Sequence, residues 1–207
     1  VGDFLFKDDS SGLKVKSPFL LNFSLYLHFP LLIVLIYFSM ILIQFHADSL
    51  LDYIGISLML GLTIGSAAVN VGHELTHQTK NPIKLFIGNW LYAIACEPFF
   101  VIEHVYGHHK NVGLLKDPAT ARRGENIYVF LFRSTYNQII SSWKIESKRI
   151  EKKGYFVLSL HNRILKSILR SMIILSFVYF VGGNIGLIFF GFSVLWSKIL
   201  LETINYV

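Results

Sequence analysis

Residues 50–77 carry the sequence LLDYIGISLMLGLTIGSAAVNVGHELTH, an apolar run that passes without interruption into a pair of histidines. The run from Leu50 to Val71 is long enough to cross the roughly 30 Å of hydrocarbon in a bilayer as a helix. His73 and His77 follow it and are four residues apart, so they share one face of a helix. This stretch predicts a membrane-spanning helix with metal ligands at its end.

The composition also indicates a membrane protein, because 53% of the 207 residues are hydrophobic and only 15% are charged. We expect an all-helical, polytopic transmembrane bundle. Residues 83–102 are apolar but interrupted by polar side chains and Pro98, which favours a helix buried in the bundle over a full span. The four predicted spans cover residues 19–45, 50–71, 165–181 and 185–201, with a turn at 182–184.

The second predicted span is rich in small residues, which let membrane helices approach one another closely. Close packing explains these positions nearly as well as a channel for an extended alkyl substrate does. The small residues are Gly55, Gly61, Gly65, Ser66, Ala67 and Ala68.

The basic residues predict the orientation of the bundle. Fifteen of the nineteen Lys and Arg residues lie between Lys80 and Arg170, whereas the predicted hairpin tips at 46–52 and 182–184 carry none. By the positive-inside rule, both tips are extracytoplasmic and the histidine clusters face the cytoplasm. His46 lies at a tip, away from the site. Apolar runs separate the cations, so the net charge of +6 does not indicate nucleic-acid binding.

The segment between the predicted hairpins is polar and basic, and it predicts a cytoplasmic helical cap at the membrane surface. Amphipathic helices are expected at Asn126–Tyr136 and Ile139–Lys152. Arg122, Arg123 and Arg133 are interpreted as membrane-surface charges in preference to a docking site for an acidic electron donor.

A second histidine cluster lies in Glu103-His104-Val105-Tyr106-Gly107-His108-His109. On a regular helix His104 and His108 share a face, while His109 is turned about 100° away toward a different coordination sphere. The two clusters therefore suggest two metal ions. The single Cys96 rules out a cysteine-based zinc or iron–sulfur site within this chain, which leaves histidine and carboxylate ligands.

Three carboxylates are candidates to support the ligands. Glu74 and Glu103 flank histidines and are expected to orient ring N–H groups in preference to binding metal. Asp117, which precedes Pro118, has two equally weighted interpretations. It forms a hydrogen bond to a ligating histidine, or it caps a helix or stabilises a turn.

The chemistry of the site has several interpretations. His73-Glu74-Leu75-Thr76-His77 matches HExxH, the motif of zinc metalloproteases, so a zinc intramembrane metalloprotease is one alternative. A non-catalytic membrane scaffold is another. Nitrogen-rich ligation by five histidines favours iron instead, and with it oxygen-dependent attack on an unactivated C–H bond.

The motifs resemble those of the integral-membrane alkane hydroxylase (alkane 1-monooxygenase) group of the fatty acid desaturase and hydroxylase superfamily. The resemblance covers most of the chain from about residue 50. The motifs that carry it are His-Glu-Leu-Thr-His, Glu-His-Val-Tyr-Gly-His-His, Asp117-Pro118-Ala119-Thr120-Ala121-Arg122 and the final Asn205-Tyr206.

This resemblance implies a monooxygenase of the bacterial inner membrane with two non-haem iron ions. It would use molecular oxygen, a hydrophobic alkyl or lipid substrate, and electrons from rubredoxin and its reductase. Membrane lipid is the other expected partner. The implied iron ligands are His73, His77, His104, His108 and His109.

The spacing in the second cluster separates hydroxylases from the alternative of a membrane fatty acyl desaturase. Desaturases typically have HxxHH in their later histidine boxes, whereas this chain has HxxxHH preceded by Glu103. In the family a third box begins Asn-Tyr and a further histidine-rich box follows. We therefore expect residues 1–207 to be an internal part of one desaturase-like domain, without an N-terminal hairpin and the C-terminal boxes.

Overall fold

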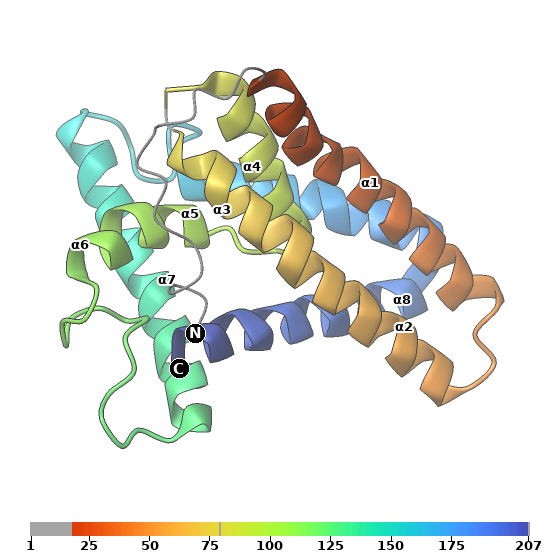
Figure 1. Ribbon diagram of the computed structural model, residues 1–207. Coiled ribbons are helices and arrows are strands. Elements are labelled where there is room, and N and C mark those ends of the chain that lie inside the picture. Colours follow the sequence, from red (N-terminus) through yellow and green to blue (C-terminus); the bar gives the residue numbers. More distant parts are fainter. Residues whose placement is uncertain (1–17, 79, 207) are drawn as a thin grey trace, which may run out of the picture.

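The fold is all-helical in the part of the chain that the computed structural model describes, residues 18–78 and 80–206, and that part contains no strand. Three of its helices are long and apolar enough to cross a membrane, which confirms the predicted fold class (Figure 1). The α-helices are α1 (Pro18–Phe45), α2 (Leu50–Thr63), α3 (Asn70–His77), α4 (Pro82–Ile94), α5 (Phe100–Glu103), α6 (His109–Asn111), α7 (Ile127–Lys152) and α8 (Arg163–Tyr206). There are also two π-helical segments: η2 (Ile64–Val69) connects α2 to α3, and η3 (His104–His108) connects α5 to α6.

Helices α1 and α2 form the predicted first hairpin. Ser49 starts α2 with a capping box, in which its hydroxyl accepts from the backbone of Asp52 and the Asp52 carboxylate accepts from the backbone of Ser49. Helix α2 then continues through η2 and α3 as one helical rod to His77 (Figure 1). The rod thus extends six residues beyond the predicted end of the span and carries the first histidine pair.

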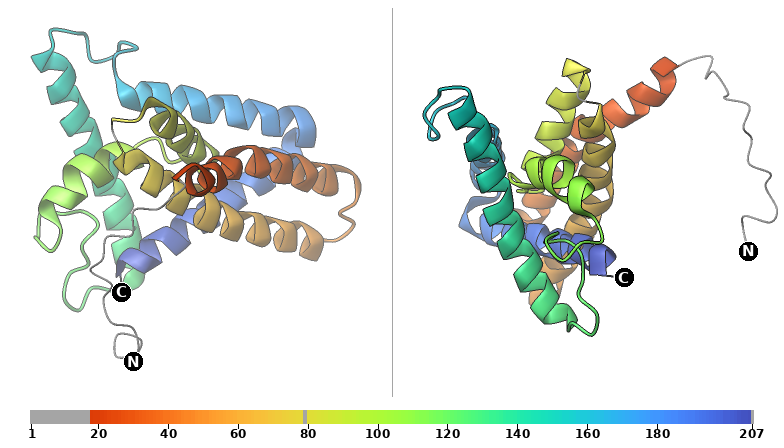
Figure 2. Two further views of the ribbon diagram at one scale, coloured as in Figure 1. Left: turned by 45° about the horizontal axis from the view of Figure 1, so that its top comes forward. Right: turned by 90° about the vertical axis from the view of Figure 1, so that its left-hand side faces the viewer.

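Helix α8 is 44 residues long, about twice the length needed to cross a bilayer. Gly183 interrupts it with φ 61° and ψ −158°, a conformation that glycine adopts without steric cost. The two halves fold back on one another as the predicted second hairpin (Figure 2). A side chain at Gly182 would touch Met40 of α1. Both hairpin turns therefore lie at the same end of the bundle, opposite α5, α6 and α7.

Helix α4 is short, and its last turn is buried in the hydrophobic core. The preference for a buried helix over a full span is therefore confirmed. The predicted single segment is divided, because Cys96 adopts a left-handed φ of 51° and Pro98 has no N–H for a helical hydrogen bond. The chain turns here, and α5 begins at Phe100.

Helix α7 crosses the end of the bundle opposite the hairpin turns. The prediction of two separate helices in this region is wrong, because Asn137 and Gln138 continue the helix without a break. The predicted start is correct, since the Asn126 side chain caps the helix by accepting from the backbone N–H of Tyr128 at 2.8 Å. Every fourth residue of α7 from Phe130 to Ile150 is buried, and these residues form one stripe that faces the bundle. It consists of Phe130, Ser134, Gln138, Ser142, Glu146 and Ile150.

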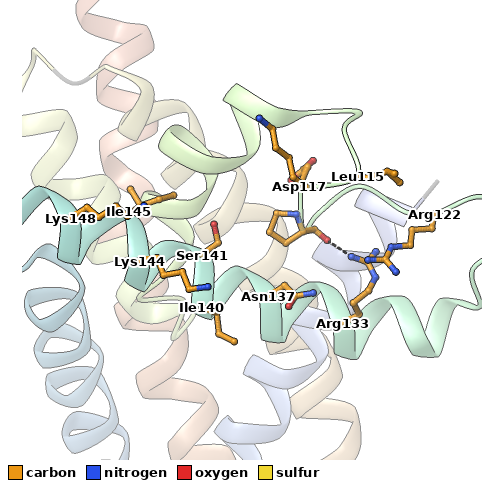
Figure 3. A pocket seen from close by; sticks show the side chains of 12 residues that line it. Leu115, Asp117, Arg122, Arg133, Asn137, Ile140, Ser141, Lys144, Ile145 and Lys148 are labelled. Carbon is orange, nitrogen blue, oxygen red and sulfur yellow. Dashed lines mark hydrogen bonds between the residues drawn. The ribbon is translucent and has the colours of Figure 1, made fainter.

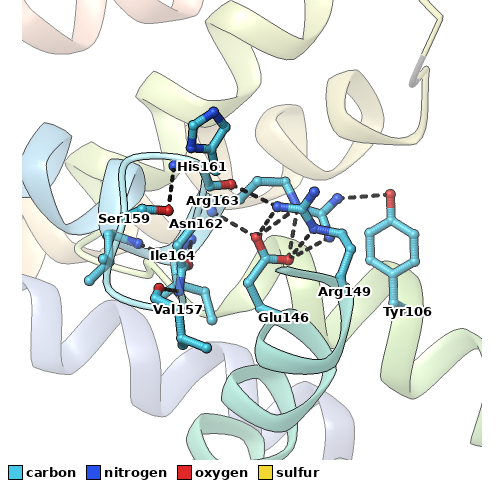
Figure 4. A network of polar contacts seen from close by, with 10 residues as sticks. Tyr106, Glu146, Arg149, Val157, Ser159, His161, Asn162, Arg163 and Ile164 are labelled. Atoms are coloured by element: carbon cyan, nitrogen blue, oxygen red, sulfur yellow. Dashed lines mark hydrogen bonds and ion pairs between the residues drawn. The ribbon is translucent and has the colours of Figure 1, made fainter. Parts of the chain in front are cut away.

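Two buried carboxylates attach α7 to α8. Glu202 accepts hydrogen bonds from Ser134 at 2.8 Å and Gln138 at 2.9 Å, and it pairs with Lys198. Glu146 pairs with both Arg149 and Arg163 (Figure 4). These contacts fix α7 across the ends of the spanning helices, where the histidines lie.

Candidate metal centre

Four histidine side chains converge at the end of the rod formed by α2, η2 and α3. The Nε2 atom of His73 lies 2.5 Å from Nε2 of His104 and 2.9 Å from Nε2 of His77. The Nε2 atom of His109 lies 2.9 Å from that of His104. Each residue offers one ring nitrogen, and the four nitrogens all lie within 4.8 Å of one another. Ring nitrogens that converge from separate segments form the geometry of a metal site.

The π-helical segment η3 decides which residues of the second cluster join this group. The backbone N–H of His109 bonds to the carbonyl of His104, five residues earlier, so these two residues share a face. On a regular helix His108 would lie there instead. The structure therefore differs from the pairing of His104 with His108 that the spacing predicts, and it brings His109 into the same cluster as His73 and His77.

His108 points to a different partner, the buried carboxylate of Asp117. The His108 Nδ1 atom lies 2.8 Å from Asp117 Oδ2. The same carboxylate accepts from the Thr120 hydroxyl at 2.5 Å and from the backbone N–H of Ala119 at 3.1 Å. Both alternatives for Asp117 are therefore present, because it stabilises a turn and holds a histidine ring at once.

The two glutamates next to histidines have contrasting surroundings. Glu74 is exposed, and its carboxylate accepts a hydrogen bond from Gln78 Nε2 at 3.4 Å. Glu103 is only 2% exposed, and neither of its carboxylate oxygens has a hydrogen-bond partner among the described residues. It borders a cavity of about 10 Å³, roughly the space of one water molecule. Besides Glu103, this cavity is lined by Phe100, His104, His108, Ala119, Gln138 and Asn205.

Comparison with known proteins agrees with this geometry. The sequence model of the fatty acid desaturase family matches residues 48–207, which include every histidine of the two clusters. The chain belongs to the fatty acid desaturase family. The resemblance to its alkane hydroxylase group is confirmed, because several similar proteins are alkane 1-monooxygenases.

Three relatives illustrate the extent of the similarity. Alkane 1-monooxygenase 1 of Pseudomonas aeruginosa is 31% identical over 86% of this chain and 47% of its own length. Alkane 1-monooxygenase of Ectopseudomonas oleovorans is 32% identical over 77% of this chain and 39% of its own. The hydroxylase component of xylene/toluene monooxygenase of Pseudomonas putida is 27% identical over 99% and 56%. The chain thus spans about half the length of these relatives or less.

The ring nitrogens of this desaturase-family site are suited to a transition metal. Burial, together with the neighbouring histidines, lowers the pKa of His104 to about 3. Burial also lowers the pKa of His109, and His77 adds to that shift. Both imidazoles are therefore neutral at physiological pH, which is the form that binds metal. Neutral imidazoles suit iron or zinc and do not suit magnesium or calcium.

Arg133 has a role that the sequence analysis missed. Its guanidinium makes a bidentate pair with Glu125 and also donates to the carbonyls of Pro118 at 3.2 Å and Thr120 at 3.0 Å. It is therefore neither a free membrane-surface charge nor a docking residue, because it fixes the loop that contains Asp117. Helical spacing in the sequence does not predict this contact, because Pro118 and Thr120 belong to an irregular loop.

Proposed function

We propose that this protein is a membrane monooxygenase that hydroxylates an unactivated C–H bond of a hydrophobic alkyl or lipid chain at a non-haem di-iron centre. The observation that carries the proposal is the convergence of four histidines at the end of a membrane-spanning rod. The similarity to alkane 1-monooxygenases supports iron and oxygen chemistry at this position. Bound iron would supply the activation of molecular oxygen: one oxygen atom would enter the C–H bond, and two electrons from the donor with two protons would convert the other to water.

The first ion would be held by the cluster of His73, His77, His104 and His109. His108 is proposed as a ligand of the second. Its Nδ1 atom is engaged by Asp117, which fixes the ring and leaves Nε2 for a metal.

Carboxylates are proposed to support these ligands. Asp117 orients His108 and makes the ring more basic. The buried carboxyl of Glu103 accepts no hydrogen bond of regular geometry from the described residues, and it borders a cavity shared with His104 and His108. Burial is the main cause that raises the pKa of Glu103 to about 7, opposed by the nearby Ser141 hydroxyl. Glu103 is therefore proposed to hold a proton or accept one from a ring N–H. Glu74 would act at the exposed edge of the cluster.

A narrow apolar groove supports a hydrocarbon substrate. It has a volume of about 250 Å³ and lies between η2 and the last turns of α8. Gly65 and Ser66 have small side chains, which leave room on one side of the groove. Asn70 also lines the groove and lies one helical turn before His73. An alkyl chain in this groove would be kept from water and directed along the rod toward the histidines. The groove is lined by Leu62, Gly65, Ser66, Asn70, Leu200, Leu201, Thr203 and Ile204.

A basic groove beside α7 is proposed to receive rubredoxin, which would be reduced by its reductase. It has a volume of about 330 Å³ and lies between α7 and the loop before it (Figure 3). Asp117 forms part of its wall and contacts His108. Only the Asp117 side chain would therefore separate a donor bound there from the proposed iron ligand His108. An acidic donor complements its charge. The cations available to a donor are Lys116, Arg122, Lys144 and Lys148, whereas Arg133, which also lines the groove, is neutralised by Glu125.

The same charges support the orientation of the protein in the membrane. We propose that the histidine end of the bundle faces the cytoplasm and that the membrane is the bacterial inner membrane. The cap around α7 is rich in lysine and arginine, whereas the opposite hairpin turns at 46–49 and 182–184 carry none.

The zinc metalloprotease alternative has less support. A catalytic zinc site has three protein ligands and an open position for water. Here four histidine nitrogens converge, and Glu74, which would act as the general base, is exposed and adjacent to Gln78. The desaturase alternative uses the same kind of centre and differs in its product.

Product analysis tests the proposal. Membranes that contain the protein would be supplied with straight-chain alkanes of graded length, rubredoxin, its reductase and ¹⁸O₂. The proposed function predicts an alcohol with one labelled oxygen, which His104→Ala abolishes and His46→Ala, at the distant hairpin turn, preserves. An alkene with no labelled oxygen would establish desaturation instead. A labelled alcohol formed equally by His104→Ala would refute the role of the cluster.

A further inference from the structure

A further pocket lies beside α4 and α5 and shares no lining residue with the two grooves. It has a volume of about 390 Å³ and opens between α4, the α5–η3 segment and the first turns of α8. The proposed metal, substrate and donor sites do not use it. Its lining residues that matter here are Val101, Ile102, Val105, Arg163, Lys166 and Arg170.

Three cations lie along one wall of this pocket. Arg163, Lys166 and Arg170 occupy positions i, i+3 and i+7 of α8, so they share one face of the helix. None of the described residues that line the pocket is acidic. The wall therefore has a strong positive charge at the level where α8 enters the membrane-spanning bundle.

Only the first of these cations is neutralised by the protein. Arg163 pairs with Glu146 at 2.7 Å and donates to the Tyr106 hydroxyl at 3.1 Å (Figure 4). Its guanidinium also lies 4.8 Å from the centre of the Tyr106 ring, so it is fixed at the rim. The side chains of Lys166 and Arg170 have no ion-pair or hydrogen-bond partner within residues 18–78 and 80–206.

The position of Arg170 makes this lack of a partner costly. It lies seven residues beyond Arg163, about 10 Å further along the helix, and its side chain is partly buried. Arg170 lies within a candidate membrane span, where an unpaired cation is unfavourable unless an anion reaches it. Val101, Ile102 and Val105 give the pocket an apolar side on α5 and η3, next to the polar Thr76 and Asn89. A ligand that fits this pocket has an anionic head and a hydrocarbon tail.

We propose that this pocket binds an acidic phospholipid, with its phosphate on Arg170 and Lys166 and an acyl chain against Val101, Ile102 and Val105. Basic pockets between spanning helices bind anionic lipid headgroups in this manner. Phospholipid is favoured over a soluble phosphate because apolar side chains line the pocket together with the cations. The proposal does not depend on the metal or on the reaction.

Native mass spectrometry of the delipidated protein in detergent tests this assignment. Phosphatidylglycerol and phosphatidylcholine with identical acyl chains would be titrated in parallel, with oleate and inorganic phosphate as separate probes. We expect binding of phosphatidylglycerol in clear preference to the other three. Arg170→Gln should weaken it about fivefold, since each cation near an anionic headgroup contributes about 1 kcal/mol.

Matched variants separate charge from folding. Arg123→Gln removes an exposed arginine outside the pocket and should leave the affinity for phosphatidylglycerol unchanged. Arg170→Lys keeps the charge and should retain binding if Arg170→Gln misfolds. Equal affinity for phosphatidylglycerol and phosphatidylcholine, or equal losses in Arg170→Gln and Arg123→Gln, would overturn the proposal. Tighter binding of oleate or phosphate would assign the site to a fatty acid or a soluble anion instead.

Discussion

The carboxylate of Asp117 lies 2.8 Å from His108 Nδ1 and is itself only 1% exposed. Its other bonds, from Thr120 and the backbone of Ala119, hold it in place, so the imidazole has one preferred orientation. Neighbouring Arg133 secures the same loop through Pro118 and Thr120. A histidine held in this manner directs its remaining ring nitrogen to a fixed point.

Replacement of this carboxylate should weaken metal binding without unfolding the protein. In Asp117→Asn the amide oxygen still accepts from His108, but the negative charge that makes the ring more basic is lost. We expect iron affinity to fall about 10- to 100-fold, as is typical for partners of metal-bound histidines. Iron titration of the metal-free protein measures this change. Asp48→Asn, at the exposed hairpin turn, is the control, and equal affinities in the two variants would exclude the proposed role.

Close packing of α2 on α8 gives a second prediction. A Cβ atom at Gly61 would come against the backbone carbonyl of Ser193, which cannot move aside as a side chain can. Gly61→Ala should therefore lower the free energy of unfolding by about 1–3 kcal/mol. Gly55 lies on the same helix with nothing within 4 Å of such an atom.

Thermal unfolding in detergent compares the two variants. Gly55→Ala should leave the midpoint unchanged or raise it slightly, because alanine favours the helix by up to about 1 kcal/mol. If the two variants unfolded at the same temperature, the small residues of this helix would not serve helix packing.

The sequence predicted the architecture well because its signals are local. Apolar runs and the Gly183 turn predict the spanning helices, and the polar interruptions and Pro98 predict a buried segment at 83–102, although not its division into α4 and α5. The sequence predicted less well which histidines lie together, because their grouping depends on the π-helical segment η3. One additional residue in that turn places His109, instead of His108, on the same helix face as His104. The spacing rules for regular helices do not predict this.

Contacts between distant segments were also outside the reach of sequence patterns. Glu202 bonds to Gln138, 64 residues earlier, and Tyr206 donates to the backbone carbonyl of Glu125. Arg133 was predicted as a surface charge, because its position on α7 does not indicate that a loop folds over it. Such pairs depend on how α7 lies across the bundle, a property of the whole fold.

The Glu146 ion-pair network predicts a pH-dependent stability. Burial disfavours ionisation of Glu146, but hydrogen bonds from Arg149 and Arg163 outweigh it and lower the pKa to about 2 (Figure 4). Because the folded-state pKa is below the unfolded value of about 4.5, the pair stabilises the protein fully above pH 4.5. This stabilisation is lost as the pH falls from 4.5 toward 2.

Glu146→Gln should therefore lower the free energy of unfolding at pH 7 by about 2 kcal/mol. Loss of one partner of a fully buried pair costs about 3–5 kcal/mol, and partial exposure of Arg149 and Arg163 reduces this cost. The difference from the unaltered protein should shrink between pH 4.5 and 3. Thermal unfolding at a series of pH values measures it, with Glu151→Gln, an exposed position on α7, as the control. A difference that stays constant with pH would contradict this account.

The most direct test of the metal centre is the metal content of the purified protein, measured by mass spectrometry of its elements. The proposal predicts bound iron in the unaltered protein and in His46→Ala, and loss of most of that iron in His104→Ala, whose ring nitrogen lies closest to that of His73. Zinc in place of iron, or an iron content unaffected by His104→Ala, would contradict the proposal that these histidines form the iron site of a monooxygenase.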